Sequence, residues 1–296
     1  MQNVLRRSSS PLPMILLGLL SLPLALGHLF SYLLTRRHKP DQTRSPAEYG
    51  LAFEKVAFRT ADVVTLRGWW IPAAGSERAI VMLHGYGGSM DPDVQYVPAF
   101  HEAGFSVLMF DFRAHGRSDG SICTVGYLER QDVLAAVDFV AGKGIERIGL
   151  LGFSMGGIVA MLTAPICPRV RAVISDGGPA RFWHALIVHG MDLGAPRWLS
   201  APLTWLTLAV TSLRVGANQF RYEPIRWVGQ IAPRPLFFIH GDRDKYIPPA
   251  DFAALVAAAG PTAEVWRVPE ANHRTVDHVH PEEYRHRVIA FFAKHL

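Results

Sequence analysis

The alternation of apolar runs with amphipathic segments predicts an α/β fold. From about residue 79 onward, short and almost continuously apolar runs alternate with longer segments whose apolar residues have helical spacing. Strands that are apolar on both faces and are separated by amphipathic helices form a parallel sheet covered by helices on both sides. We predict such strands at residues 79–83, 106–110, 148–151, 170–174, 235–239 and 264–268, and helices at residues 94–103, 128–140, 158–162 and 281–295.

The globular domain is predicted to span residues 49–296 and to contain an insertion. Residues 53–58 and 63–71 are rich in Val, Phe and Trp and are joined by a polar turn, so they are expected to add an antiparallel pair to a mostly parallel sheet of eight strands. The segment from about residue 177 to 230 is too long for a plain connection between two strands. We therefore predict a helical lid there.

A long uncharged segment near the N-terminus predicts a membrane anchor. Residues 12–34 contain no Asp, Glu, Lys or Arg, and a helix of this length spans the roughly 30 Å hydrocarbon core of a bilayer. Residues 1–11 form a basic tail, and the polar, basic residues 35–48 are predicted to be a linker. The alternatives are a secretory signal peptide that is cleaved, with a secreted product, and a helix that is merely buried in the protein. Basic residues on both sides leave the orientation of the anchor open.

The positive charge is confined to the N-terminal segment. The whole chain has a formal net charge of +5, and residues 1–44 contain six basic residues and one acidic residue, so the remainder is neutral. This distribution argues against a basic nucleic-acid-binding surface. The two cysteines, Cys123 and Cys167, do not have the spacing of metal ligands. We therefore expect no nucleic-acid partner, no metal and no cofactor.

Residues 152–157 contain a candidate nucleophile. The sequence Gly-Phe-Ser-Met-Gly-Gly follows one predicted strand and precedes a predicted helix. A serine flanked by glycines at this position is typical of a sharp strand-to-helix turn that presents the hydroxyl above the sheet. Ser154 is the candidate nucleophile. The backbone N–H of Met155, at the start of the helix, is then placed to stabilise an oxyanion.

Two further loops follow predicted strands. Residues 84–89 are glycine-rich, which allows backbone N–H groups to approach a substrate, and we assign the second oxyanion donor to the backbone N–H of Tyr86. Residues 111–118 contain Asp, Arg and His side chains at a strand end. We expect these polar side chains to hold the turn through hydrogen bonds to the backbone.

A carboxylate and a histidine occur after the last two predicted strands. His273 follows the final strand, and Asp176, Asp242 and Asp244 each follow an earlier strand. Ligands bind beyond the carboxyl ends of the strands in such sheets, so Ser154, one of these aspartates and His273 are expected to meet there. The order of serine, aspartate and histidine along the chain is the one found in α/β-hydrolases.

The globular domain resembles the serine hydrolases of the α/β-hydrolase superfamily, in its bacterial branch of esterases, lipases and aminopeptidases. The similarity extends from about residue 64 to the C-terminus and is carried by residues 84–85, 111–118, 152–157, 234–248 and 281–284. Ala114 and Asn272 depart from it, since glycine is commoner at both positions. The resemblance places the triad acid at Asp244, and Asp242 is then expected to hold the turn through backbone hydrogen bonds.

This resemblance implies a serine hydrolase that acts through an acyl-enzyme. His273 takes the proton of Ser154, Asp244 fixes the histidine tautomer, and water then hydrolyses the acyl group. The expected substrate is a carboxylic ester or thioester with an apolar acyl group. The alternatives are a peptidase or amidase of the same fold and a non-catalytic binding protein that uses the fold.

The lid is expected to select the substrate. Residues 183–191 and 198–213 are apolar and aromatic, and residues 199–213 carry no charge. Side chains of this kind either pack on the sheet or form an apolar acyl pocket. On the second interpretation, the substrate-binding residues are Trp183, Trp198, Trp205 and Leu206.

Overall fold

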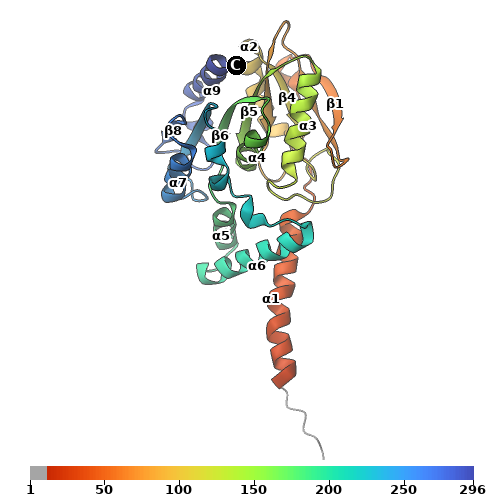
Figure 1. Cartoon of the computed structure of the whole chain (residues 1–296), viewed down its shortest axis with the longest axis vertical. Helices are drawn as coiled ribbons and strands as arrows, with labels where there is room; N and C mark the ends of the chain where they lie inside the picture. The colour runs from red at the N-terminus through yellow and green to blue at the C-terminus, as the bar shows by residue number, and fades with distance from the viewer. Residues whose placement is uncertain (1–11) are drawn as a thin grey trace, which may run out of the picture.

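An eight-stranded sheet forms the centre of the computed structural model, which describes residues 12–296, with side chains from residue 21 onward (Figure 1). The strands are β1 (Glu54–Arg59), β2 (Thr65–Ile71), β3 (Arg78–Leu83), β4 (Ser106–Phe110), β5 (Arg147–Phe153), β6 (Val170–Asp176), β7 (Leu236–Gly241) and β8 (Glu264–Val268). Their order across the sheet is β1-β2-β4-β3-β5-β6-β7-β8. The pairs β1–β2 and β2–β4 are antiparallel and the others are parallel, which confirms the predicted sheet.

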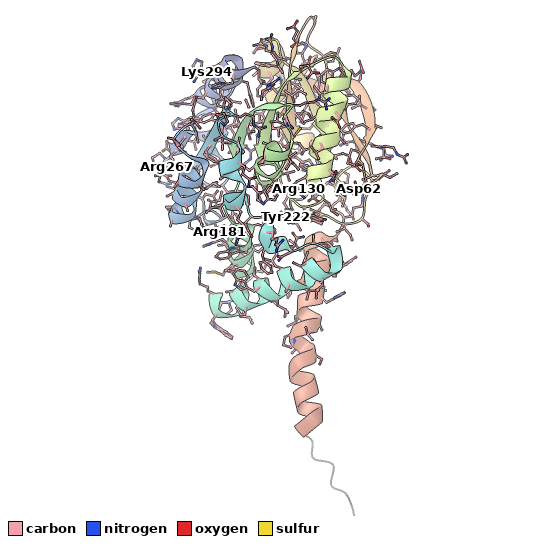
Figure 2. The ribbon with its side chains drawn as sticks, in the orientation of Figure 1. Asp62, Arg130, Arg181, Tyr222, Arg267 and Lys294 are labelled. Atoms are coloured by element: carbon pink, nitrogen blue, oxygen red, sulfur yellow. The ribbon has the colours of Figure 1, made fainter. Side chains whose placement is uncertain are left out.

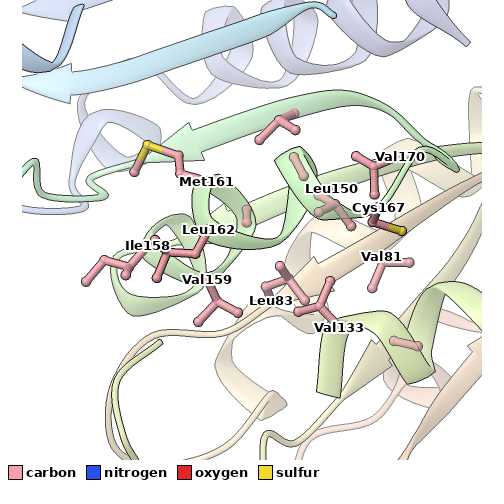
Figure 3. Packing of buried hydrophobic residues seen from close by; sticks show 14 of the residues in the cluster. Val81, Leu83, Val133, Leu150, Ile158, Val159, Met161, Leu162, Cys167 and Val170 are labelled. Carbon is pink, nitrogen blue, oxygen red and sulfur yellow. The ribbon is translucent and has the colours of Figure 1, made fainter. Parts of the chain in front are cut away.

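Two hydrophobic layers cover the two faces of the sheet. Successive residues of a strand point to opposite faces, so Val81 and Leu83 of β3 join one cluster, whereas Ile80 and Met82 join the other. Figure 3 shows how α4 packs in the first cluster against β3 and β5. The helices of the domain are α2 (Val97–Glu102), α3 (Glu129–Gly142), α4 (Met155–Thr163), α7 (Pro249–Ala259), α8 (Val276–Val279) and α9 (Pro281–His295).

The insertion between β6 and β7 contains two helices, α5 (Phe182–Asp192) and α6 (Arg197–Val215), which lie at one end of the molecule (Figure 1). The chain then returns to the sheet over the side of α3. There the guanidinium of Arg130 lies 4.6 Å from the ring centre of Tyr222 and 5.3 Å from that of Trp227, and Figure 2 shows Arg130 beside Tyr222. These cation–π contacts fix the end of the lid to the domain.

The helix α1 (Leu12–Thr35) packs against the lid with its C-terminal part and projects from the domain with the rest (Figure 1). Gly27 is needed at the crossing, because a Cβ there would lie 2.7 Å from Leu206 of α6. Further along, the Ser31 hydroxyl is hydrogen-bonded to the Thr211 hydroxyl at 2.9 Å and accepts a hydrogen bond from Arg214 at 2.8 Å. The end of α1 is therefore part of the folded domain.

The prediction of a linker over residues 35–48 needs correction, because this segment packs on the domain. Arg37 donates hydrogen bonds to the carbonyl oxygens of residues 116, 118 and 120 at 2.8, 2.6 and 3.0 Å. The amide of His38 donates to the Ala114 carbonyl at 2.8 Å, and the Asp41 carboxylate accepts from the Ser89 amide at 2.8 Å. The polar and basic side chains of this segment therefore form hydrogen bonds with backbone groups of the domain.

Within the part of the chain that the structure describes, no helix has both the length and the apolar character needed to cross a bilayer. The prediction of an anchor at residues 12–34 is therefore not supported by the structure and stays a prediction. Residues 1–11, the predicted basic tail, lie outside the described residues, as do the side chains of residues 12–20.

Candidate active site

Ser154 occupies a sharp turn between β5 and α4. Its backbone dihedrals are φ 50° and ψ −108°, a strained conformation for a residue that carries a side chain. The turn depends on two glycines: a Cβ on Gly152 would overlap the carbonyl oxygen of Gly156, and a Cβ on Gly156 would overlap that of Leu83. The Ser154 side chain consequently borders a cavity at the carboxyl end of β5.

The structure brings Ser154, His273 and Asp244 together in one chain of hydrogen bonds. Ser154 Oγ lies 3.0 Å from His273 Nε2, and His273 Nδ1 lies 2.6 Å from Asp244 Oδ2. The other carboxylate oxygen of Asp244 accepts a hydrogen bond from the Tyr246 amide at 2.8 Å. The side chain of Asp244 is 1% exposed and that of His273 is 25% exposed, so the imidazole faces the cavity while the carboxylate is shielded from water.

The two competing aspartates are engaged elsewhere. The side chain of Asp242 pairs with Arg267 at 2.8 Å. The sequence had suggested that this side chain would hold the turn through backbone hydrogen bonds, which is wrong. Asp176 pairs with Arg274 and accepts a hydrogen bond from the Tyr284 hydroxyl at 2.8 Å. Among the described residues, Asp244 is the only one whose carboxylate bonds to His273.

The two backbone groups that were predicted to bind an oxyanion lie beside Ser154. Tyr86 and Met155 both border the cavity, and a Cβ on Gly85 would lie 3.7 Å from the Ser154 Cβ. Met155 is the first residue of α4, where backbone N–H groups have no helical partner. Within residues 12–296, neither amide donates a hydrogen bond to another backbone group outside the regular elements. These amides are therefore available to a ligand.

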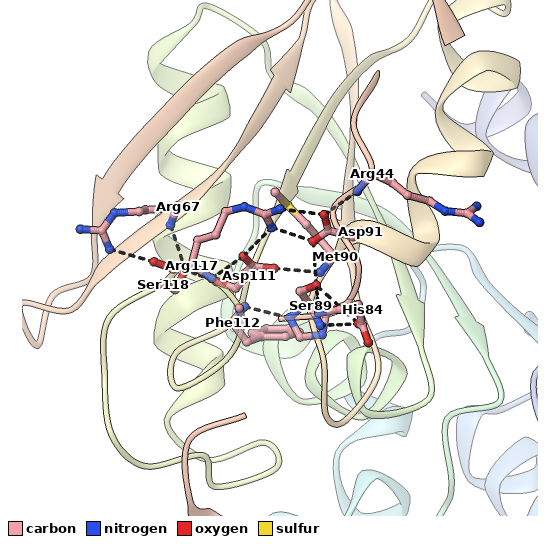
Figure 4. Close-up of polar contacts among 12 residues, drawn as sticks. Arg44, Arg67, His84, Ser89, Met90, Asp91, Asp111, Phe112, Arg117 and Ser118 are labelled. Atoms are coloured by element: carbon pink, nitrogen blue, oxygen red, sulfur yellow. Dashed lines mark hydrogen bonds and ion pairs between the residues drawn. The ribbon is translucent and has the colours of Figure 1, made fainter. Parts of the chain in front are cut away.

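The turn at residues 111–118 supports the loop that carries Tyr86. The Asp111 carboxylate accepts hydrogen bonds from the amides of Met90 at 2.8 Å and Arg117 at 2.7 Å (Figure 4). Arg117 in turn pairs with Asp91 through two contacts at 2.6 and 2.7 Å. The expectation that these polar side chains stabilise the turn is confirmed.

Three histidines pack behind the same loop. His84 Nε2 accepts a hydrogen bond from the Phe112 amide at 3.0 Å, and His115 Nε2 accepts one from the Gly87 amide at 3.3 Å. The ring of His38, from the N-terminal segment, stacks on His115 with ring centres 4.8 Å apart. Burial lowers the pKa of His84 to about 4 and also lowers the pKa values of His38 and His115. The cluster is therefore neutral near pH 7.

A cavity of about 1060 Å³ opens beside Ser154 and His273. Its apolar part is lined by α1, α5 and α6, whose contributing residues include Phe30, Leu33, Leu34, Phe182, Leu186 and Leu203. This volume is typical of a site that holds a small molecule with an apolar part.

The four side chains that were predicted to bind substrate do not line this cavity. The ring of Trp183 packs on Trp205, 5.2 Å between centres, and Leu206 packs on Gly27 of α1. Trp205 is 43% exposed and Trp198 is 76% exposed. The prediction assumed that the aromatic side of the lid faces inward, whereas the structure places it outward or against α1.

The sequence argument missed the charged residues of the cavity, among them Arg274 and Asp93. Arg274 and Asp93 both line the cavity, 3.5 Å apart, and the Arg274 guanidinium lies 3.9 Å from the centre of the Phe153 ring. Burial raises the pKa of Asp93 to about 7. The position of Arg274 next to His273 in the sequence could have indicated that Arg274 lies at the site, whereas nothing in the sequence indicated this for Asp93.

The arrangement can perform nucleophilic chemistry. With Nδ1 of His273 donating to Asp244, its Nε2 is free to accept the Ser154 proton, and the amides of Tyr86 and Met155 can stabilise a developing oxyanion. In the part of the chain that the structure describes, no group of three or more His, Cys, Asp or Glu side chains is arranged to hold a metal ion.

Comparison with known proteins identifies several similar chains. Residues 78–205 match the family described as alpha/beta hydrolase fold. The uncharacterized protein YfhR of Escherichia coli O157:H7 is 27% identical over 249 residues, which cover 80% of this chain and 80% of YfhR. The thiohydrolase apmlB of Arthrinium phaeospermum is 33% identical over 135 residues, which cover 41% of this chain and 42% of apmlB.

The solved structure of the Pyrococcus furiosus esterase PF2001 is similar over most of its length. The similarity covers 88% of this chain and 98% of the esterase chain, with a TM-score of 0.73 and 28% sequence identity. The shared part thus includes nearly the whole esterase chain.

The histidine cluster predicts a pH dependence of folding stability. A histidine whose pKa is lowered below its ordinary value of 6.5 binds fewer protons in the folded state, so its stabilising contribution is present above pH 6.5 and is lost as the pH falls toward the folded-state pKa. His38→Gln removes one such group. The decrease in unfolding free energy from pH 7 to pH 5 should then be smaller than in the wild type, by at most about 1.4 kcal/mol per pH unit.

Urea unfolding at both pH values measures this difference. His286→Gln, which changes an exposed histidine of α9, is the control and should follow the wild type. An equal or steeper decrease in His38→Gln would contradict the prediction.

Proposed function

Because the chain belongs to the α/β-hydrolase superfamily, we propose that it is a serine hydrolase that cleaves a carboxylic ester or thioester through an acyl-enzyme. The observation that carries this proposal is the chain of hydrogen bonds from Asp244 through His273 to Ser154 at the edge of the cavity. The similarity to an esterase of known structure supports hydrolysis of esters. The name of the apmlB relative supports a thioester as the second substrate class.

The proposed reaction begins with attack of Ser154 Oγ on the carbonyl carbon of the substrate. His273 Nε2 accepts the hydroxyl proton, and the nearby Asp244 carboxylate stabilises the imidazolium that forms. The backbone N–H groups of Tyr86 and Met155 donate to the oxyanion. Collapse of this intermediate transfers the proton from His273 to the leaving oxygen or sulfur, and water then cleaves the acyl-enzyme with His273 as base.

The apolar part of the cavity is the proposed acyl site. It extends from Ser154 between α1, α5 and α6 and is lined by aliphatic and aromatic side chains such as Phe30, Leu186 and Leu203. Burial of an acyl chain there is favourable by about 0.8 kcal/mol for each methylene group. The predicted membrane anchor at residues 12–34 remains part of the proposal on the basis of the sequence, and it places this site next to a membrane.

A fluorophosphonate probe tests whether Ser154 is a nucleophile. The purified full-length protein should be labelled, because an activated serine attacks phosphorus irreversibly. Ser154→Ala should not be labelled although its circular dichroism spectrum is unchanged. The absence of labelling in folded wild-type protein, or labelling that survives in Ser154→Ala, would overturn the proposal and favour a binding protein.

The triad acid is tested by replacing each aspartate with asparagine. Asp244→Asn should lower kcat by roughly 10⁴, because the amide no longer selects the correct histidine tautomer or stabilises the imidazolium. Asp242→Asn and Asp176→Asn lose ion pairs with Arg267 and Arg274 and should affect kcat far less. Near-normal kcat in folded Asp244→Asn would show that the acid is wrongly assigned.

The acyl site is tested with a chain-length series of activated esters. Leu203→Ala shortens a side chain that lines the cavity, so kcat/KM should fall several-fold for long acyl chains, at about 0.8 kcal/mol per lost methylene contact, and little for acetate. Leu206→Ala on the same helix is the matched control, since Leu206 packs against α1. Equal losses for all chain lengths in Leu203→Ala would indicate a purely structural role.

A further inference from the structure

The helix α6 has an inverted distribution of polar and apolar residues. Its buried residues are Ser200, Thr204, Thr207, Leu208 and Thr211, four of which carry hydroxyl groups. Two of these hydroxyls bond to backbone carbonyl groups: Ser200 donates to that of Ile187 in α5 at 2.7 Å, and Thr211 donates to that of Thr207 at 2.7 Å. A surface helix of a protein in water normally shows the opposite arrangement, with its apolar side toward the core.

The outward side of the lid is apolar. Leu193 is 72% exposed, Trp198 is 76% exposed and Leu213 is 84% exposed, and Leu199 and Trp205 are also exposed. We call these five residues the outer lid face. An exposed apolar surface of this kind is typical of a site that contacts another apolar body.

The projecting part of α1 extends this apolar surface. Leu22, Leu24 and Leu29 are 63%, 58% and 49% exposed, and α1 crosses α6 at the same end of the molecule (Figure 1). Of the seventeen large apolar side chains that are exposed among the described residues, eleven come from residues 22–33 and 191–213. The exposed apolar side chains are therefore concentrated at this end.

Within residues 193–222, which carry the outer lid face, every charged residue is positive. This segment contains Arg197, Arg214 and Arg221 but no Asp or Glu, and Asp192, which precedes Leu193, pairs with Lys245 at 2.7 Å. Such a rim is attracted to anionic lipid headgroups, and Trp side chains are favoured at the boundary between headgroups and acyl chains. A second copy of this chain would bring the same positive charges face to face, which is unfavourable. The charge thus favours a lipid surface over self-association.

The cavity reaches this apolar end of the molecule. Leu33 of α1 and Leu193 after α5 both line the cavity, and both are exposed, by 37% and 72%. The same cavity also borders Ser154. Between α1 and the lid, the cavity wall combines apolar side chains of α1 and α5 with the hydroxyl groups of Ser200, Thr204 and Thr207 of α6.

We propose that the outer lid face and the projecting part of α1 dock on a lipid bilayer, and that the cavity takes its acyl substrate directly from that bilayer. The docking is argued from the surface residues alone, whereas the entry of substrate from the bilayer rests on the proposed hydrolase function. The substrate class is then a membrane-resident acyl ester.

Docking is tested on the full-length protein with an environment-sensitive fluorophore on a single introduced cysteine. Leu213→Cys and Leu193→Cys place it on the outer lid face, and Val63→Cys, at a residue that is 64% exposed elsewhere, is the control; the native cysteines are buried. The probe is a vesicle of phosphatidylcholine and phosphatidylglycerol. Brominated lipids should quench the fluorophore at positions 213 and 193, and aqueous iodide should quench it only at position 63.

Two results would overturn the docking. Quenching of the lid positions by iodide would show that they face water. Protection from both quenchers would show that protein covers them, which means a second copy.

Substrate entry is tested by the double variant Trp198→Gln, Leu213→Gln, with Val63→Gln, Ile166→Gln as control. Hydrolysis of an acyl ester embedded in the vesicles should fall by about tenfold or more in the first variant, while hydrolysis of a soluble acetate ester is unchanged. Equal losses on both substrates would overturn entry from the bilayer. If the wild type hydrolyses neither ester, the proposed function fails, and the quenching result still decides the docking.

Discussion

The close contact between the first turn of α4 and the end of β3 determines the geometry of the site. Leu83 and Gly152 are paired in the parallel register of β3 and β5, and Gly156 lies against the Leu83 carbonyl, where no Cβ fits. This contact holds Ser154 in its strained conformation and brings the loop after β3 next to the amide of Met155. The candidate nucleophile and both candidate oxyanion donors are therefore positioned by the packing of one helix on one pair of strands.

The N-terminal segment closes the site from the other side. Residues 36–44 are bound to the turns that support the loop of Tyr86, and the end of α1 supplies one wall of the cavity. The elements that complete the cavity, α1 and α6, are also those that expose apolar side chains to the surroundings. The proposed acyl site and the proposed lipid-docking surface are therefore formed by the same pair of helices.

The sheet, the turn at Ser154 and the grouping of Ser154, Asp244 and His273 could be predicted because each depends on local periodicity or on order along the chain. The presence of a helical lid could also be predicted, but not which side of α6 faces inward, because a hydroxyl such as that of Thr211 can be buried when it bonds to the helix backbone. The packing of Arg37 on three carbonyl groups was hidden for a similar reason, since backbone acceptors leave no signature in the sequence.

The central claim is that Ser154 carries the acyl group during the reaction. Mass spectrometry of the full-length protein, mixed with an activated acyl ester and quenched rapidly in acid, measures this directly. The account predicts a mass increase of one acyl group, located on the peptide that contains Ser154, which decays as the ester is consumed. Ester hydrolysis without such an adduct, or an adduct confined to another residue, would contradict it.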